Sequence, residues 1–135
     1  MQHTTTPLLT INVSCKESIE IKGHRQTVVM VPFDGTAEGG CFSGKVIGVG
    51  YDTQKITPDG KCMLSARYVL EGKDASGNAC RVFIENESRE DGKIRPQITT
   101  DSPALGFLES ETMYSEISPV QDGVIIRIFP DQKQS

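Results

Sequence analysis

The feature that most constrains this chain is the alternation of apolar and polar residues in many short runs, with turn-forming residues between the runs. A period of two places successive side chains on opposite faces of a β-strand, and regularly spaced turns are typical of an antiparallel sandwich or barrel. The pattern therefore predicts an all-β protein with eight strands. They are expected at residues 7–14, 17–22, 26–33, 41–50, 61–71, 79–87, 111–117 and 123–129.

Four intervals between these runs carry residues that tolerate the backbone angles of a tight turn. They lie at residues 58–60, 75–78, 90–92 and 121–123. Each of them predicts a hairpin connection. One segment, residues 102–110, carries helix signals instead, because Ser102 can cap a helix and Pro103 suits its first turn. We expect at most about two turns of helix there.

The length of 135 residues suits one domain with a single core. We therefore expect one β-barrel domain over residues 1–135, with an ordered core over roughly 7–130. A sheet of eight or more strands that are apolar on one face tends to close, because closure removes unpaired edges. The predicted fold is a closed antiparallel β-barrel of about eight or more strands, whose interior holds side chains or one small ligand.

Charge and composition disfavour several classes of partner. The chain has 18 acidic and 14 basic residues, a net charge of -4, and no basic run longer than two residues. Such a surface is a poor match for nucleic acid or for an anionic membrane. No apolar stretch approaches the length of a membrane helix, and the first residues lack the features of a secretory signal. We expect a cytoplasmic protein.

Neither the cysteines nor the histidines predict a metal site or a cofactor. The four cysteines lie 18 to 26 residues apart without a CxxC pair, at positions 15, 41, 62 and 80. This spacing favours buried free thiols over a zinc site, a redox motif or disulfides. His24 is one of two histidines, and a serine hydrolase would need a GxSxG motif that the chain lacks. We retain His24 as a ligand-binding candidate only.

The stretch VPFDGTAEGGCFSG, residues 31–44, holds four glycines after an apolar run and raises the question of a phosphate loop. Such a loop needs GxGxxG or GxxxxGK[ST] between a strand and a helix. Here Gly39 and Gly40 lead into another strand-like run, and Val46 follows Lys45 where Ser or Thr is required. We predict a strand, a reversal over residues 34–40 with its glycines as hinges, and a strand that begins at Cys41.

Polar residues within the predicted strands are the candidates for chemistry. Alternation puts Ala66 and Tyr68 on one face and Arg67 on the other. Because a short hairpin joins the two strands, Arg67 and Glu85 are placed to meet across the pair, and their charge-assisted hydrogen bond would then line a cavity. Two interpretations remain open: Arg67 binds an oxygen while Glu85 or Asp52 moves a proton, or Arg67 and Glu85 form an exposed ion pair worth under ~1 kcal/mol.

Asp52 follows two glycines at alternate positions, Gly48 and Gly50. Glycine inside a strand commonly marks a bend or a close approach of backbone or ligand. Asp52 is therefore either a second acid or base in the site, or a residue that caps a turn within residues 52–60. Both interpretations remain open.

Several short motifs follow one another from about Leu8 to Phe129: GHR at 23–25, a proline and glycine loop at 32–39, GYD at 50–52, ARY at 66–68, Asn86, and DGV at 122–124. In this order they resemble the family called domain of unknown function 3237, or uncharacterised protein family 0311. The resemblance implies a closed antiparallel barrel, similar in architecture to allene oxide cyclase and dirigent-type barrels, with no settled activity. His24 replaces an arginine of the family pattern, Thr53 a tryptophan, and Glu87-Ser88 a glycine.

Two functions are consistent with these observations. In the first, the lumen binds a small, partly apolar organic molecule, either as a binding protein or as a cofactor-free isomerase, cyclase or lyase. The candidate catalytic residues are Asp52, Arg67 and Glu85, and the candidate ligand-binding residues are Tyr68, Asn86 and His24. In the second, a structural or interaction barrel has a filled core, binds no ligand, and forms a homo-oligomer through its outer face. Exposed apolar positions on both faces of residues 123–129 would favour this second function.

Overall fold

The computed structural model describes residues 6–131, so the predicted domain ends at residues 1–5 and 132–135 lie outside the described part. Within these described residues, nine strands and one 3-10 helix follow one another. They are β1 (Leu9–Cys15), β2 (Ile19–Lys22), β3 (Thr27–Glu38), β4 (Phe42–Ile56), β5 (Cys62–Asp74), β6 (Ala79–Ser88), β7 (Ile94–Thr100), η1 (Pro103–Glu109), β8 (Met113–Val120) and β9 (Gly123–Pro130).

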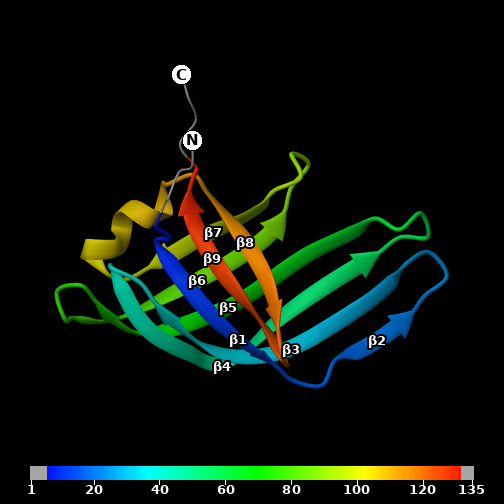
Figure 1. Cartoon of the computed structure of the whole chain (residues 1–135), viewed down its shortest axis with the longest axis horizontal. Helices are drawn as coiled ribbons and strands as arrows, with labels where there is room; N and C mark the ends of the chain where they lie inside the picture. The colour runs from blue at the N-terminus through cyan, green and yellow to red at the C-terminus, as the bar shows by residue number, and fades with distance from the viewer. Residues whose placement is uncertain (1–5, 132–135) are drawn as a thin grey trace.

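Eight of the strands close into an antiparallel barrel (Figure 1). Neighbouring strands are hydrogen-bonded in the order β1, β9, β8, β7, β6, β5, β4, β3, and the pairing of β1 with β3 closes the ring. β2 pairs with the first part of β3 and β1 with the second part, so β2 lies outside the ring. The predicted closed β-barrel with one short helix is confirmed.

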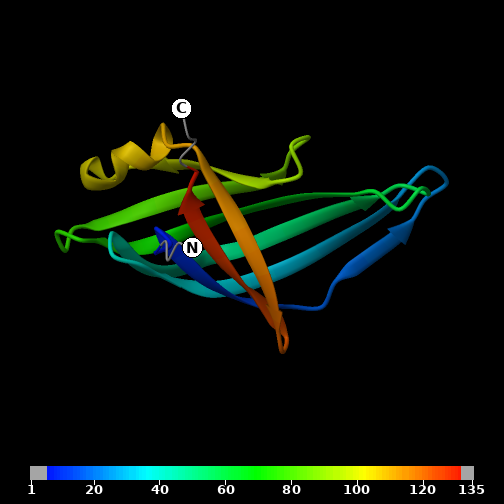
Figure 2. The same cartoon turned by 45° about the horizontal axis from the view of Figure 1, so that its top comes forward.

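Three long strands reach beyond the ring on one side. β3, β4 and β5 have 12, 15 and 13 residues, and their far ends carry β2 as a fourth strand (Figure 2). We call this part of the sheet, residues 19–22, 27–30, 53–56 and 62–65, the extension. The extension leaves β2 at the edge of the molecule.

Apolar side chains of the alternating runs pack most of the barrel interior. Ile11, Leu70, Ile84 and Ile128 are among those with no exposed surface, and burying a side chain of this size contributes roughly 1.5–3 kcal/mol. η1 covers one end of the core with Leu105 and Leu108. Ser102 caps this helix by accepting a hydrogen bond from the Leu105 N–H, so the helix prediction is confirmed. Over the described residues, no helix has the length and hydropathy that crossing a bilayer requires.

All four predicted hairpin turns are confirmed. They join β4 to β5, β5 to β6, β6 to β7, and β8 to β9. Each has one residue with a positive φ, namely Gly60, Gly77, Gly92 and Asp122. Glycine and aspartate tolerate this region of backbone space better than β-branched residues do, which is why these turns could be found from the sequence.

The prediction of eight strands is wrong because it omits β7. Its sequence, IRPQITT, contains Pro96, and a proline weakens the strand signal since it cannot donate a backbone hydrogen bond. Pro96 is compatible with β7 because one edge of this strand is almost unpaired. β7 pairs with β6 over its whole length but with β8 at one residue pair, Ile94 with Ser115.

The predicted reversal over residues 34–40 is also wrong. β3 continues through the glycine-rich stretch to Glu38, and the chain reverses at residues 39–41. A register shift between Phe33 and Thr36 marks a bulge in the strand. Gly35 lies in this bulge, where a β-carbon would clash with the carbonyl oxygen of Asn12 on β1. This glycine therefore permits the close approach of two strands and is not a hinge.

Candidate functional site

A cavity of about 140 Å³ lies inside the barrel, and its wall is mostly apolar. An engineered apolar cavity of about 150 Å³ in another protein accepts benzene, so a lumen of this size can hold one small ring. The side chains that line it come from seven of the eight barrel strands. They are Val13, Cys15, Val31, Phe33, Asp52, Leu64, Ala66, Asn86, Ile117, Val124 and Ile126.

Two polar residues of this wall, Asp52 and Asn86, are brought together by the strand register. Asp52 of β4 is opposite Ala66 of β5, and Ala66 is opposite Asn86 of β6. Side chains directly across an antiparallel pair point to the same face of the sheet. The Cα atoms of Asp52 and Asn86 are thus about 10 Å apart, two strand spacings, with only the methyl group of Ala66 between their side chains.

One oxygen of the Asp52 carboxyl group accepts a hydrogen bond and the other has no partner in the described residues. Its Oδ2 accepts a hydrogen bond from Gln54 Nε2 at 2.9 Å, whereas Oδ1 is buried and has no hydrogen-bond partner within residues 6–131. Burial raises the pKa of the Asp52 carboxyl above its ordinary value, and the bond from Gln54 opposes this rise in part. A carboxyl group whose pKa moves toward neutrality is better suited to take up and release a proton.

Asn86 has no exposed surface and is fixed by one neighbour. Ser115 Oγ donates a hydrogen bond to Asn86 Oδ1 at 2.9 Å, which leaves the amide Nδ2 as the free end of the side chain. Nδ2 is buried without an acceptor in the described part of the chain. A buried donor without a partner costs about 1–3 kcal/mol, so a ligand oxygen that accepted this hydrogen bond would recover much of that loss.

Cys15 in the cavity wall and Tyr68 next to the wall residue Phe33 are unsuited to reaction. The Tyr68 hydroxyl is buried with no partner among residues 6–131, its ring packs edge-on against Phe33 at 5.3 Å between centroids, and it is not part of the cavity wall. Burial raises the pKa of Tyr68. Burial, and then the charge of Asp52, raise the pKa of the Cys15 thiol. Both groups therefore stay protonated at neutral pH.

The predicted pair of Arg67 and Glu85 forms, but not in the lumen. Arg67 Nε donates to Glu85 Oε2 at 2.7 Å, and 64% of the Arg67 side chain is exposed. Arg67 is opposite Tyr51 whereas Ala66 is opposite Asp52, so Arg67 and Asp52 point to opposite faces of the sheet. Of the two interpretations, the one in which Arg67 lines the lumen is wrong, and the geometry supports the exposed ion pair.

The structure also bears on the expectations for His24 and Asp52. His24 is exposed in the turn between β2 and β3 and is not part of the cavity wall. Asp52 lies inside β4, five residues before the turn at residues 57–61, so the interpretation that it caps a turn is wrong. No cluster of three or more metal-ligating side chains occurs within residues 6–131.

Sequence reasoning missed three members of the site: Cys15, Gln54 and Ser115. Gln54 follows Asp52 by two residues, so alternation alone could have placed it on the same face. Ser115 gives no such signal, because it reaches Asn86 through the closure of the barrel across 29 residues of sequence.

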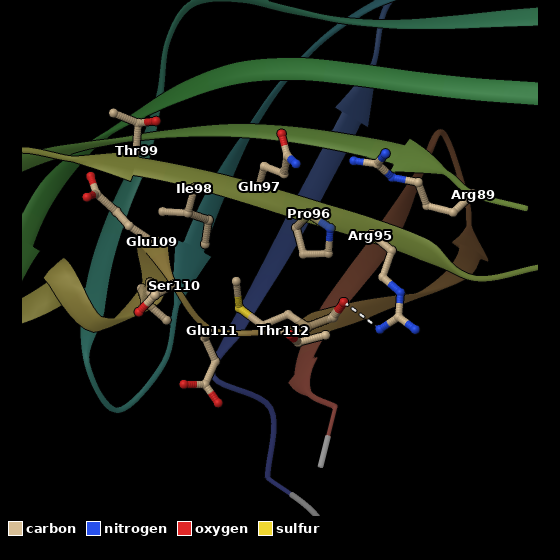
Figure 3. A pocket seen from close by; sticks show the side chains of 12 residues that line it. Arg89, Arg95, Pro96, Gln97, Ile98, Thr99, Glu109, Ser110, Glu111 and Thr112 are labelled. Atoms are coloured by element: carbon tan, nitrogen blue, oxygen red, sulfur yellow. Dashed lines mark hydrogen bonds between the residues drawn. The ribbon is translucent and has the colours of Figure 1, made fainter. Parts of the chain in front are cut away.

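A second, larger hollow lies outside the lumen, between β7 and the segment that joins η1 to β8 (Figure 3). It has a volume of about 540 Å³ and is lined mostly by polar side chains. Its Arg95 is already engaged, since Nη1 donates to the Met113 carbonyl oxygen at 3.0 Å and to Asp131, and Nη2 donates to Asp91 at 2.8 Å. Unlike the lumen, this groove has no buried side-chain nitrogen or oxygen atom without a hydrogen-bond partner among residues 6–131.

Comparison with known proteins identifies the family. A UPF0311 protein of Clostridium acetobutylicum is 40% identical over 67 residues, which are 50% of this chain and 39% of that protein, so the match spans well under half of this relative. The fold matches a crystal structure of a protein with unknown function from the same organism, with a TM-score of 0.76, 21% identity, and coverage of 96% of this chain and 100% of the other.

A second solved structure, of an enzyme from Penicillium herquei, matches with a TM-score of 0.68 and 16% identity, covering 95% of this chain and 99% of the other. At these identities the likeness concerns the fold alone. Residues 3–86 of the sequence match the model of one protein family. The chain therefore belongs to the DUF3237 family, the proteins of unknown function that the order of its motifs resembles.

Proposed function

We propose that the lumen binds a small, mostly apolar organic molecule, about the size of one ring, that carries an oxygen and an exchangeable hydrogen. The observation that carries this proposal is the coincidence of an apolar cavity of about 140 Å³ with two unpartnered polar atoms on its wall residues, Asp52 Oδ1 and Asn86 Nδ2. Small-molecule sites generally combine an apolar wall with a few such convergent polar groups. Asn86 donates to the ligand oxygen, and Asp52 accepts the hydrogen.

The same arrangement suits a cofactor-free isomerase, cyclase or lyase. Asp52 takes a proton from one position of the bound molecule and returns it to another, while Asn86 stabilises the oxygen on which negative charge develops. Each of these reactions needs positioning and proton transfer but no change in oxidation state. The description of the Penicillium herquei neighbour as an enzyme agrees with this part of the proposal.

The alternative of a filled barrel without a ligand has less support. The lumen contains the cavity described above, and residues 123–129 have no exposed apolar side chain, the feature that would favour this alternative. Along β9, Ile126, Ile128 and Phe129 are buried and the remaining residues are half-buried.

Phenol tests the binding proposal, because its ring fits the lumen and its hydroxyl group both donates and accepts a hydrogen bond. Isothermal titration of the wild type should give one site, and phenol at about a hundredfold over its Kd should stabilise the fold by about 2.7 kcal/mol. Ala66→Leu fills the space between Asp52 and Asn86 and should abolish both effects. Arg67→Ala, a matched change on the outer face, should leave them intact.

Lack of phenol binding by the wild type would overturn the lumen proposal, and so would binding that survives in Ala66→Leu. Loss of binding in Arg67→Ala would move the site to the outer face. Circular dichroism of both variants separates a loss of binding from a loss of folding.

A small cyclic ketone tests the proton transfer by itself. In deuterated buffer the wild type should speed the exchange of the hydrogens next to the carbonyl group, and Asp52→Asn should not, because an amide cannot accept that proton. Equal exchange rates for the two proteins would rule out acid–base chemistry at Asp52 and would leave the binding proposal standing.

We also propose that the protein works in a reducing compartment, in agreement with the expected cytoplasmic location. All four cysteines are free, with Cys80 buried, Cys15 and Cys41 half-buried, and Cys62 exposed. Free thiols of this kind persist where glutathione and thioredoxin keep cysteines reduced. The sequence predicted buried free thiols, and of the four cysteines Cys80 alone is fully buried.

A further inference from the structure

The strand β2 has one free edge. It pairs through residues 19–22 with β3 and ends the strand order of the sheet, so no other strand within residues 6–131 covers its second edge (Figures 1 and 2). The free edge lies on the extension, away from the lumen. None of the four residues of β2 lines the cavity.

The backbone groups that face this free edge belong to Glu20 and Lys22. The Gly23 N–H donates to the carbonyl oxygen of Gln26 at 2.9 Å, so the backbone groups of odd-numbered residues point toward β3. Backbone direction alternates along a strand, and the even-numbered Glu20 and Lys22 must point their N–H and C=O groups outward. Neither of these side chains forms a salt bridge in the described residues.

The same strand exposes two large aliphatic side chains. Ile19 and Ile21 are each 63% exposed, on the face of the sheet that also carries Met30, which is 38% exposed and directly opposite Ile19. Exposed apolar side chains beside an unpaired strand edge are characteristic of a surface that another strand covers.

We propose that β2 pairs with β2 of a second copy of this chain, antiparallel, about a two-fold axis through Ile21. This register places Glu20 opposite Lys22 of the second copy, and Lys22 opposite Glu20 of that copy. Both pairs are of the hydrogen-bonded type, because the outward backbone groups belong to the same two residues, which gives four main-chain hydrogen bonds. The two Ile21 side chains meet at the axis on the apolar face.

The charges select this register over the neighbouring ones. A two-fold axis through Glu20 would place two glutamates opposite each other, and an axis through Lys22 would place two lysines opposite each other. Like charges directly across a strand pair are destabilising, and opposite charges are stabilising. The sequence IEIK is therefore self-complementary in one antiparallel register only, and that register also uses the free backbone groups.

Charge reversal tests this dimer without disturbing the contact of β2 with β3. Sedimentation equilibrium over a dilution series should show the wild type as a monomer and dimer in exchange. Glu20→Lys and Lys22→Glu should each raise the dissociation constant about tenfold, because each creates two like-charge pairs per dimer. The double variant restores both opposite-charge pairs and should regain most of the wild-type affinity. Glu111→Lys, a matched charge reversal at an exposed site far along the chain, should have no effect.

A cysteine at the axis gives a second measurement. In a Cys62→Ser background, Ile21→Cys should oxidise rapidly to a covalent dimer, because a non-hydrogen-bonded pair has Cα atoms about 4.5 Å apart, which suits a disulfide. Ile19→Cys, which the register places opposite Gly23 of the second copy, should cross-link much more slowly.

A wild type that stays monomeric at all concentrations would overturn the proposal and would mean that the charges of β2 protect the edge from pairing. A dimer that both single charge reversals leave unchanged would overturn it too, since its interface would then lie elsewhere. Neither outcome bears on ligand binding in the lumen.

Discussion

Asp52 is the residue on which the proposed chemistry depends, and its environment follows from its position in β4. Its neighbours on the inner face are apolar except for Gln54 and Asn86, so the carboxylate loses water without gaining a cation. The other carboxylates with altered acidity show the reverse behaviour. Hydrogen bonds from Arg95 lower the pKa values of Asp91 and Asp131.

Asp52→Asn should raise the free energy of unfolding at neutral pH by about 1 kcal/mol, because the amide still accepts the hydrogen bond from Gln54 but carries no charge that loses water on folding. The folded-state pKa of Asp52 lies above its ordinary value of 3.8, so the wild type loses stability as the pH rises through this interval. The difference in unfolding free energy between the variant and the wild type is thus largest above the raised pKa and disappears toward pH 3.8. Urea unfolding of both proteins across this range measures it, and a variant less stable than the wild type at neutral pH would contradict it.

The face of the sheet on which a side chain lies was predictable wherever the alternation of apolar and polar residues alone determines it. Alternation correctly separated Ala66 and Tyr68 from Arg67, and correctly paired Arg67 with Glu85. The inner position of Asp52 depends in addition on the register between β4 and β5, which shifts between Ile47 and Tyr51 around the positive φ of Gly48. The sequence does not reveal where a bulge of this kind occurs, so it does not give the register between β4 and β5. Arg67 and Asp52 therefore could not be assigned to opposite faces of the sheet from the sequence.

At the level of elements, the seam between β7 and β8 differs from all the other junctions of the barrel. It has one residue pair, Ile94 with Ser115, whereas β4 and β5 share twelve. Farther along β7 the edge is partly covered by a side chain, since the Thr100 N–H donates to Glu109 Oε2 at 2.9 Å. The Arg95 contacts with Met113 and Asp131 hold the opposite end of the seam.

Hydrogen exchange should reveal this seam at single residues. The Asp101 N–H donates to the Arg81 carbonyl oxygen, so odd-numbered amides of this segment point toward β6 and the Ile98 amide points into the groove at the seam. The Ile98 amide should therefore exchange much faster than those of Gln97 and Thr99. Amide exchange followed by NMR tests this, and equal protection of the three amides would contradict it.

The same seam explains what the sequence could and could not predict about elements. Strands with regular alternation and a glycine turn at each end were found, as β5 and β6 show. β7 was missed because Pro96 weakens its signal, although a proline fits there since its missing N–H would point into the open seam. The predicted strand at residues 26–33 ends before β3 does, because the glycines at 35 and 39 resemble a turn. These glycines are required by the close packing of β1, which is a long-range contact that the sequence does not show.

For the whole molecule, closure of the barrel converts scattered residues into a site. Asp52 and Asn86 line the same cavity because β4, β5 and β6 are neighbours in register, and Cys15, Ile117 and Val124 complete the wall. Closure was predictable from the number of half-apolar strands, and the order of the motifs gave the family. The volume left inside the barrel was not predictable, because it depends on how the side chains of seven strands fit together.

The lumen and the free edge of β2 are two separate surfaces of the molecule, although Leu64 of the extension also lines the lumen. The lumen lies within the ring of eight strands, whereas the free edge of β2 lies outside it, on strands that continue past the cavity. Dimer formation through β2 would therefore leave the lumen of each copy unchanged. The two proposals can fail independently of each other.

The crystal structure of the protein soaked with phenol tests the central claim most directly, namely that the lumen at Asp52 and Asn86 is a ligand site. The ring should lie against Phe33 and Ala66, with the phenol oxygen within hydrogen-bond distance of Asp52 Oδ1 or Asn86 Nδ2. An empty lumen at saturating phenol, or phenol bound only in the groove between β7 and β8, would contradict the claim.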